Sequence, residues 1–344
     1  MKQRYVYLDV VRCLACFLVV VMHSMRGGDN ANAVLYVALD TLAKPCNALF
    51  FMASGALLLP IKIDGTRFLK RRLAKIIIPC LVWTLVVNLI DVAYGELSFG
   101  EMLAILVNVP FSDKAYGILW FVYVLIGLYI LAPILSPWLI SASKNEVKWL
   151  LGIWGVTLIL TIARNFIGFP ADERQMLYYF GGYGGYFILG YYLHQYRPRH
   201  NTLLLMFMIL LSFVVALLLR TPMFLELNRD SFLGYLSIFI ALSSYSWFVL
   251  IQKSISSNIG ENESDKNNSL ICNLVAKVSN LTFGVYLLHI IVRNAIWHIP
   301  FVISHGCIIE LILTISLTFI FSLGVAWLIS MLPFANYIIG YKKL

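Results

Sequence analysis

The sequence predicts an all-α, polytopic integral membrane protein with about ten transmembrane helices and both ends in the cytoplasm. Three observations support this: the composition, the length of the apolar runs and the placement of the cationic residues. Of 344 residues, 60% are hydrophobic and 12% are charged, and the mean hydropathy is +0.83. Soluble domains contain about 25% charged residues. A chain this apolar needs lipid around it, where only helices and closed barrels satisfy the backbone. Barrel strands alternate in polarity, whereas these apolar runs are continuous, so helices are predicted.

Ten segments are long enough to cross a membrane, which takes about 20 apolar residues for roughly 30 Å of hydrocarbon. They are predicted at residues 7–25, 34–60, 76–94, 119–140, 149–166, 178–196, 202–219, 231–251, 279–298 and 306–332. The sixth segment is rich in glycine and tyrosine, which allows either close helix packing or a break that lines a cavity. No segment resembles a second domain, so residues 1–344 are predicted to form a single transmembrane domain.

The cationic residues indicate the orientation. With the N-terminus inside, 17 of the 26 Lys and Arg residues lie on the cytoplasmic side and seven on the opposite side. The positive-inside rule therefore predicts an N-in/C-in protein. The net charge of +9 is mostly a topology signal, and no nucleic acid is expected as a partner because no soluble domain presents a basic face. Cys13 and Cys16 have CxxC spacing but no second pair, so no metal site is predicted.

The first span contains three ionisable residues, Asp9, Arg12 and His23. Ionisable groups inside a membrane are costly and are functional candidates by default. Arg12 and His23 are eleven residues apart, so on a helix they share one face and are separated by about 16 Å along the axis. Asp9 is one turn before Arg12 and can pair with it. The alternatives are an Arg12 side chain that reaches the inner surface and an interfacial His23 bonded to a carbonyl or water.

A basic run, Arg67 to Lys75, precedes the third span and reads as a helix beside the inner membrane surface. It contains Arg67, Arg71, Arg72 and Lys75. One interpretation is attraction to lipid head groups; the other is a binding site for a phosphorylated cytosolic ligand, because Arg and Lys form charge-assisted hydrogen bonds with phosphate.

Further polar residues lie within the predicted spans, among them Asp40, Ser54 and His289. In the predicted topology most of them fall in the outer half of the membrane, as His23 does. This clustering indicates a polar cavity that opens outward. The alternative for each residue is a hydrogen bond between packed helices.

Five motifs occur in order along nearly the whole chain. They are Arg12 and His23 separated by ten residues, Pro45 to Gly55 (PCNALFFMASG), the basic run, Leu119-Trp120-Phe121-Val122, and Tyr286-Leu287-Leu288-His289. With these motifs the chain resembles the acyltransferase 3 family, membrane O-acyltransferases of bacterial surface polysaccharides. The resemblance implies an enzyme of the inner cell membrane that moves an acyl group, usually acetyl, from cytosolic acyl-CoA to a hydroxyl of a carbohydrate or lipid-linked acceptor. No permanently bound cofactor is implied, since acetyl-CoA or another acyl-CoA is a substrate.

The resemblance also implies residue roles. His23 is expected to be catalytic together with Arg12, and the basic run with Arg67, Arg71, Arg72 and Lys75 is expected to bind the donor. Trp120, Ser54, His289 and Asp40 are expected at the substrate site, and Ser54 is a weaker candidate for an acyl-carrying nucleophile. The basic run ends in Lys75, where arginine is more typical of the family. Lysine keeps the charge but lacks the bidentate fork, so this position departs from the pattern.

Two other functions fit the same features. An exporter of a polysaccharide or lipid-linked sugar, without bond chemistry, also needs many spans and an outward cavity. A membrane sensor or assembly component would use the buried charges only for structure. The exporter predicts that labelled acetyl-CoA leaves no acetyl on a polymer. The sensor predicts that substitutions of Arg12 and His23 change the abundance of the protein and not an activity.

Overall fold

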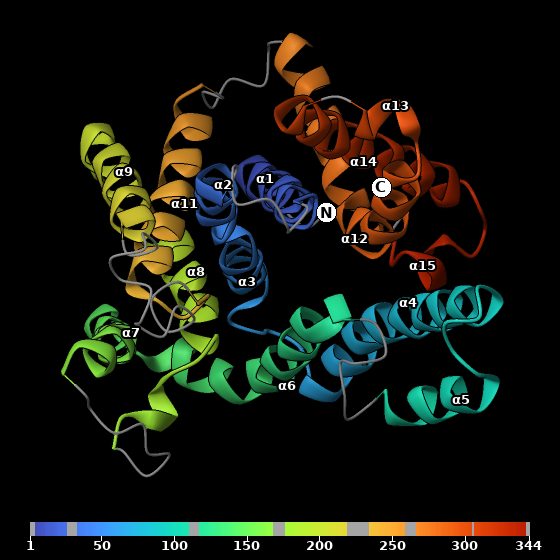
Figure 1. The fold of residues 1–344 in the computed structure, drawn as a ribbon. Coiled ribbons are helices and arrows are strands. Elements are labelled where there is room, and N and C mark those ends of the chain that lie inside the picture. Colours follow the sequence, from blue (N-terminus) through green and yellow to red (C-terminus); the bar gives the residue numbers. More distant parts are fainter. Residues whose placement is uncertain are drawn as a thin grey trace. The chain divides into compact units, whose positions relative to one another are not determined.

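The computed structural model describes residues 4–25, 33–109, 117–167, 176–218, 234–258, 266–304 and 306–341 (Figure 1). Within these ranges the regular elements are helices and no strand occurs, which confirms the all-α class. Six helices in this part of the chain are long and apolar enough to cross a membrane, as expected of a multi-pass membrane protein: Val6–His23, Gly65–Ala93, Gly117–Ser141, Ile238–Ile255, Leu270–Trp297 and Cys307–Ser330. The count of ten and the N-in/C-in orientation stay predictions.

The chain divides into two compact units, each made of two stretches of sequence. Unit 1 comprises Met1–Pro60 and Ser136–Ser279, and unit 2 comprises Ile61–Leu135 and Asn280–Leu344. The helices wholly in unit 1 are α1 (Val6–His23), α2 (Ala33–Ala43), α3 (Pro45–Leu58), α7 (Lys144–Ile167), α8 (Gly184–Tyr196), α9 (Thr202–Leu218) and α11 (Ile238–Asn258). Those wholly in unit 2 are α4 (Gly65–Ala93), α5 (Phe99–Asn108), α13 (Pro300–Ile303), α14 (Cys307–Ser330) and α15 (Ala335–Ile338). The unit boundaries fall within α6 (Trp120–Ser141) and α12 (Lys266–Trp297). The single transmembrane domain stays a prediction.

Two predicted spans differ from the helices that form. The segment 34–60 is not one helix, because α2 ends at Ala43 and α3 begins at Pro45, whose ring nitrogen has no hydrogen to donate to the preceding turn. The segment 178–196 is helical only from Gly184, after a short 3₁₀ turn and Gly182 at φ +91°. The predicted break in this glycine-rich segment therefore occurs at its start.

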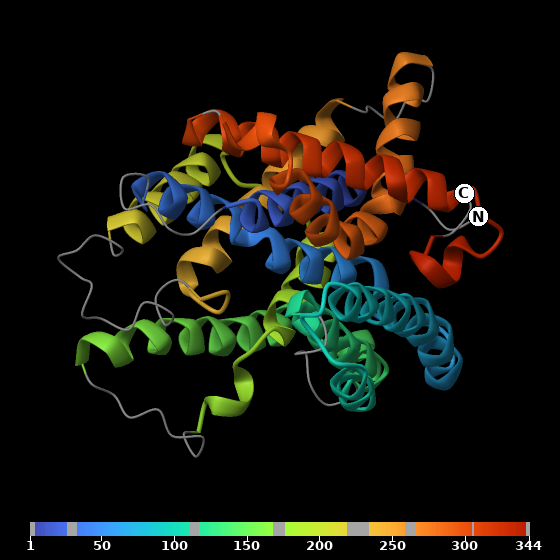
Figure 2. The same cartoon turned by 45° about the vertical axis from the view of Figure 1, so that its right-hand side comes forward.

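The other differences lie in unit 2. The basic run is helical, as predicted, and continues without interruption into the third span as the single helix α4. The segment 95–118, between two predicted spans, contains a helix, α5, which lies beside α4 in both ribbon views (Figure 2). A capping box starts it: the Ser98 side chain accepts from the Glu101 amide, and the Glu101 carboxylate accepts from the Ser98 amide.

Helices α3 and α8 of unit 1 pack backbone against backbone. A Cβ atom on Gly55 would overlap the backbone of Phe187, and a Cβ atom on Gly190 would overlap the backbone of Met52. Each helix therefore contributes a glycine at the point where it meets the other. Small residues at such contacts are typical of membrane helices, which lack a hydrophobic driving force between them. The predicted role of the sixth segment's glycines in close packing is confirmed at Gly190.

The N-terminal end of α1 is held by a nearly buried carboxylate. Asp9 accepts two hydrogen bonds from Arg4, of 2.6 and 3.2 Å, and one of 2.7 Å from the Ser279 hydroxyl. Arg4 also donates to the carbonyl oxygen of Ala276 at 2.9 Å. Arg4 and Asp9 thus form an ion pair, and the pairing of Asp9 with Arg12 stays a prediction. Tyr7, the second residue of α1, hydrogen-bonds His194 of α8 at 2.5 Å.

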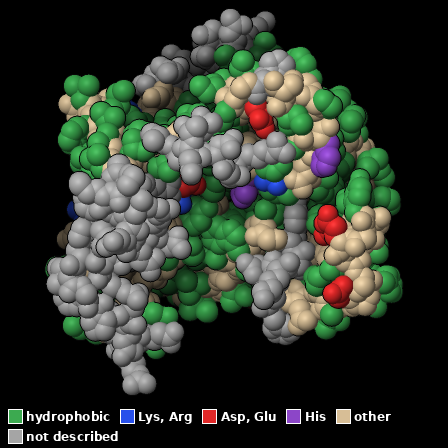
Figure 3. Space-filling view, viewed as in Figure 1, with side chains coloured by type: hydrophobic (Ala, Val, Ile, Leu, Met, Phe, Trp, Pro, Cys, Tyr) green, Lys and Arg blue, Asp and Glu red, His purple; other side chains and the backbone are tan. Residues whose placement is uncertain are grey.

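Apolar side chains cover much of the outer surface, and charged side chains are sparse on the face seen in Figure 3. Helix α14 displays this pattern clearly, since its exposed positions are bulky and its buried positions are small. The exposed side chains include Ile308, Ile312, Ile320, Phe321 and Trp327, and the buried ones include Thr314, Thr318, Ser322 and Ala326. Large apolar groups outside and small groups inside fit a helix whose outer face meets lipid.

Replacing Gly190 with alanine is expected to destabilise the protein, because the added Cβ forces the α3 and α8 backbones apart. Overpacking of this kind costs about 1–3 kcal/mol. Gly184, in the same helix, has no atom within 4 Å of an added Cβ and provides the matched control. Thermal unfolding in lipid nanodiscs measures both variants. Equal melting temperatures for G190A and G184A would contradict the contact.

Replacing Asp9 with alanine is expected to lower the free energy of unfolding by about 1–3 kcal/mol, the usual cost of leaving buried hydrogen-bonding partners unsatisfied. Asp9→Asn should lose less, because the amide oxygen still accepts from Ser279. Chemical unfolding followed by tryptophan fluorescence gives the comparison. The anchoring role is wrong if D9A unfolds at the wild-type denaturant concentration.

Candidate active site

His23 is the last residue of α1, and its ring orientation is fixed by the helix itself. Its Nδ1 lies 3.0 Å from the carbonyl oxygen of Val19. A carbonyl oxygen only accepts hydrogen bonds, so Nδ1 carries the proton and Nε2 carries the lone pair. The end of α1 has a partial negative charge that favours a cation, which stabilises an imidazolium by about 0.3–1 kcal/mol. His23 is thus arranged to accept a proton at Nε2.

A polar cluster lies beside this end of α1 within unit 1. The Asp40 carboxylate and the Lys44 ammonium form an ion pair of 3.1 Å on α2, and Lys44 lies 5.8 Å from the ring centroid of Tyr235. The Tyr235 hydroxyl donates to the sulfur of Met22, the residue before His23, at 3.1 Å. Tyr235 thus connects this cluster to the end of α1 that carries the predicted catalytic histidine.

Tyr235 was not among the residues expected at the site. It lies outside the motifs and 213 positions from Met22 in sequence. Its only local signal is an aromatic residue next to Gly234, at the start of a predicted span. Asp40 was expected, and the structure brings it together with Lys44 and Tyr235. The polar cavity that opens outward stays a prediction.

Arg12 and Ser54, the other expected site residues of unit 1, are both half-buried. Arg12 lies on the same unbroken helix as His23, so the regular helix assumed for their common face is confirmed. Ser54 directly precedes Gly55, the residue that lies against the Phe187 backbone. Ser54 therefore belongs to the α3–α8 contact region.

The basic run occupies the first three turns of α4 in unit 2. Asp64 caps this helix, accepting a hydrogen bond of 2.8 Å from the Arg67 amide. Arg67, Arg71 and Lys75 are exposed, and Arg72 is half-buried. Their spacing of four residues places Arg67, Arg71 and Lys75 along one side of α4. This row of cations can bind several phosphate groups of one ligand.

Two of the sequence motifs meet in unit 2. The Tyr286 hydroxyl donates to the carbonyl oxygen of Ile118, just before Leu119-Trp120-Phe121-Val122, and the rings of Phe121 and Tyr286 are 5.6 Å apart. Trp120 packs edge-on against Phe121, with ring centroids 6.4 Å apart. The start of α6 and the middle of α12 are therefore locked together.

His289 lies on the same part of α12 and is completely buried. Its Nδ1 donates to the carbonyl oxygen of Tyr286 at 2.6 Å. The structure thus brings His289 and Trp120 into one aromatic cluster through Tyr286 and Phe121. Among the described residues, no three His, Cys, Asp or Glu side chains gather as metal ligands do.

Comparison with known proteins identifies the family. Neither a curated protein nor a solved structure matches the chain significantly. A family model described as an acyltransferase domain matches residues 5–331, nearly the whole chain. The match includes α1 with Arg12 and His23, the basic run on α4, and the two motifs that meet at Tyr286. The chain is therefore a multi-pass membrane protein that belongs to the acyltransferase 3 family.

Proposed function

We propose that this protein transfers an acetyl group from cytosolic acetyl-CoA to a hydroxyl of a cell-surface carbohydrate or lipid-linked sugar. It does so in the inner cell membrane, with ten spans and an N-in/C-in orientation. The observation that carries the chemistry is His23 at the end of α1, with Nδ1 bonded to the Val19 carbonyl and Nε2 carrying the lone pair. The family supports acyl transfer in general.

The reaction needs a general base, and His23 is suited to that role. The acceptor oxygen attacks the thioester carbonyl carbon while Nε2 takes the hydroxyl proton. The bond between carbonyl carbon and sulfur then breaks, and the CoA thiolate takes the proton back from the imidazolium. The Val19 carbonyl and the C-terminal end of α1 stabilise the transient positive charge. His23 leaves the cycle in its starting tautomer, so no acyl-enzyme on Ser54 is required.

The donor side and the acceptor side are assigned from charge and chemistry. The exposed cations of α4, Arg67, Arg71 and Lys75, suit the phosphates of acyl-CoA. Arg12 is on the cytoplasmic part of α1 in the N-in orientation, where it can bind the donor. The Asp40–Lys44 pair and Tyr235 suit a sugar, because an acid and an ammonium hydrogen-bond hydroxyls and an aromatic ring packs against the pyranose face. Trp120 and His289, which lie in the buried cluster around Tyr286, are also assigned to the substrate site.

The orientation of the spans determines on which side of the membrane the donor meets Arg12 and the acceptor meets His23. In the N-in orientation, His23 is on the outer side and Arg12 on the inner side of one helix face, about 16 Å apart. The slim thioester arm of acetyl-CoA can follow that face from the cytosol. The acetyl group then reaches a glycan that never enters the cell.

The N-in/C-in orientation predicts that alkaline phosphatase fused after Leu344 is inactive, because this reporter folds only outside the cytoplasm. The same reporter inserted after residue 29, between the first two spans, is expected to be active. Phosphatase activity in intact cells, normalised to fusion abundance, gives the comparison. An active C-terminal fusion would overturn the proposed topology.

Replacing His23 with alanine is expected to lower acetyl transfer at least about 100-fold, the usual contribution of a general base. Transfer is measured as labelled acetyl that passes from acetyl-CoA to isolated glycan in membranes. His298 provides a matched control, because it also follows a helix and bonds the carbonyl of Asn294 through Nδ1 at 2.7 Å. His298→Ala should keep wild-type activity.

The same assay separates the enzyme from the exporter. If H23A retains full transfer at normal abundance, the catalytic assignment is wrong. If wild-type membranes place no acetyl on any acceptor while glycan export depends on this chain, the exporter is correct instead.

A further inference from the structure

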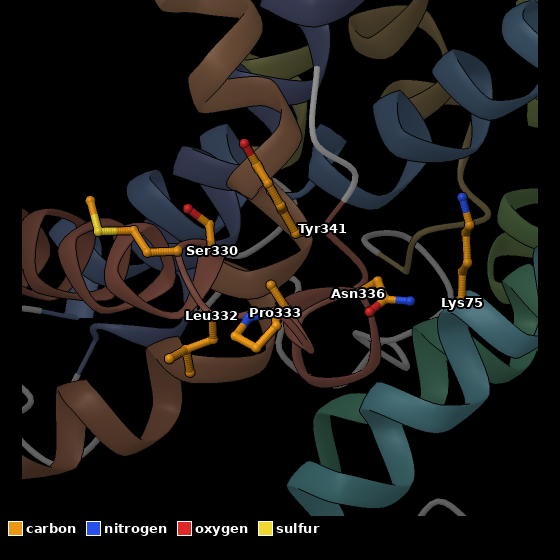
Figure 4. A pocket seen from close by; sticks show the side chains of 8 residues that line it. Lys75, Ser330, Leu332, Pro333, Asn336 and Tyr341 are labelled. Atoms are coloured by element: carbon orange, nitrogen blue, oxygen red, sulfur yellow. The ribbon is translucent and has the colours of Figure 1, made fainter.

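A cavity in unit 2 lies where the basic run meets the C-terminal segment. Its volume is about 710 Å³, which is in the range of small-molecule binding sites. Figure 4 shows Lys75 on α4 at one side, and Ser330, Pro333, Asn336 and Tyr341 of the C-terminal segment at the other. Met331, Leu332 and Ala335 complete the lining.

The C-terminal wall is fixed to α4 by two backbone contacts. The indole nitrogen of Trp83 donates to the carbonyl oxygen of Ile338 at 2.8 Å. Gly340, at φ +63°, lies against the carbonyl oxygen of Lys75 and the ring of Phe283, where a Cβ would be within 3.0 Å of both. Both the backbone conformation and the lack of space favour glycine at this position. These contacts hold the C-terminal segment in a fixed position against α4, and one of them is made by the main chain of Lys75.

The lining combines four chemical groups that one class of ligand uses together. Lys75 supplies a cation for phosphate. Asn336 supplies an amide that can pair with the edge of adenine, donating to N7 and accepting from N6. Tyr341 supplies a ring on which a base can stack. The Ser330 hydroxyl donates to the carbonyl oxygen of Trp327 at 2.6 Å, and its oxygen can accept a hydrogen bond from a ribose hydroxyl. In Figure 4 the Asn336 amide points toward the side on which Lys75 lies.

The neighbouring cation extends the site along α4. Arg71 is exposed and is four residues before Lys75, so both project from one side of the helix. A ligand with its base at Asn336 and a phosphate at Lys75 can therefore place further phosphates along this row. A lipid head group brings phosphate but no base, so it would leave the amide and the tyrosine ring without a function. The combination favours a nucleotide with several phosphates.

We propose that this cavity binds the adenine nucleotide end of the acyl donor, with Asn336 on the base edge, Tyr341 on the base face and Lys75 on a phosphate. The inference rests on the proposed function, because acetyl-CoA is the donor there. It adds the C-terminal segment to the donor site, and in that site the segment recognises the adenine base. Asn336 contacts the donor far from the reacting carbonyl, so it determines donor affinity and not the chemical step.

The test compares two donors that differ only in the nucleotide. Acetyl-CoA carries it, and S-acetyl-pantetheine has the same thioester arm without it. Asn336→Leu is expected to lower kcat/KM for acetyl-CoA about tenfold, through KM, and to leave kcat/KM for S-acetyl-pantetheine unchanged. Tyr337, the next residue of α15, is 50% exposed and does not line the cavity, so Tyr337→Ala is the matched control with wild-type values for both donors.

Lys75 provides a second variant that does not depend on folding of the C-terminal segment. Lys75→Gln should lower kcat/KM for acetyl-CoA and leave kcat/KM for S-acetyl-pantetheine unchanged. Lys75→Arg should keep most of the wild-type kcat/KM for acetyl-CoA, because arginine retains the positive charge. A structural role for Lys75 or Asn336 predicts equal losses with the two donors. Equal losses, or no loss with acetyl-CoA, would overturn the proposal.

Binding of CoA to the purified protein, measured by calorimetry, separates this proposal from the proposed function. Weaker CoA binding by N336L and K75Q than by the wild type supports the cavity. If the wild type binds CoA and both variants bind it equally well, the cavity is wrong while the function stands. If the wild type neither binds CoA nor transfers acetyl from it, the function and the cavity are both wrong.

Discussion

The placement of α1 depends on the Asp9 carboxylate, whose charge costs free energy in the low dielectric of a membrane. The Asp9 side chain is only 10% exposed, and its carboxylate is held by Arg4 and Ser279. A carboxylate in a medium of low dielectric must be paired and hydrogen-bonded, and so it fixes the groups around it. Because Ser279 is on α12, the ion pair sets the position and rotation of α1. Arg12 and His23 project from that helix, so their direction follows from a pair formed at its start.

Polar chemistry is concentrated at a few points of an otherwise apolar molecule. In unit 1 these are the Asp9 pair and the Asp40–Lys44–Tyr235 cluster, and in unit 2 they are the exposed cations of α4 and the cavity at Lys75. The Asp9 pair is anchored through a main-chain atom, the Ala276 carbonyl oxygen that accepts from Arg4, and His23 is anchored in the same way by the Val19 carbonyl. Main-chain anchors hold a side chain where helix geometry places it, which is the kind of preorganisation that acyl transfer needs.

The sequence was sufficient for features that depend on local pattern. Hydrophobic runs predicted the helical membrane class, and the spacing of Arg12 and His23 predicted their common helix. Features set by distant residues were out of reach: Ser279 against Asp9, Tyr235 beside Met22, and Tyr286 against Ile118 each join segments that no periodicity relates. The sequence does carry a local signal for α5, since Ser98 and Glu101 form its capping box, but a helix of ten residues is too short to register as a membrane span.

The glycines of α3 and α8 have a mechanical consequence. Where Gly55 and Gly190 meet the opposite backbone, no side chain stands between the two helices, so no rotamer change can absorb a displacement. An interface of this kind is stiff, because relative sliding would at once bring main-chain atoms into collision. The two helices therefore move together as one rigid unit. Any motion that admits a bulky acceptor has to occur in segments other than α3 and α8.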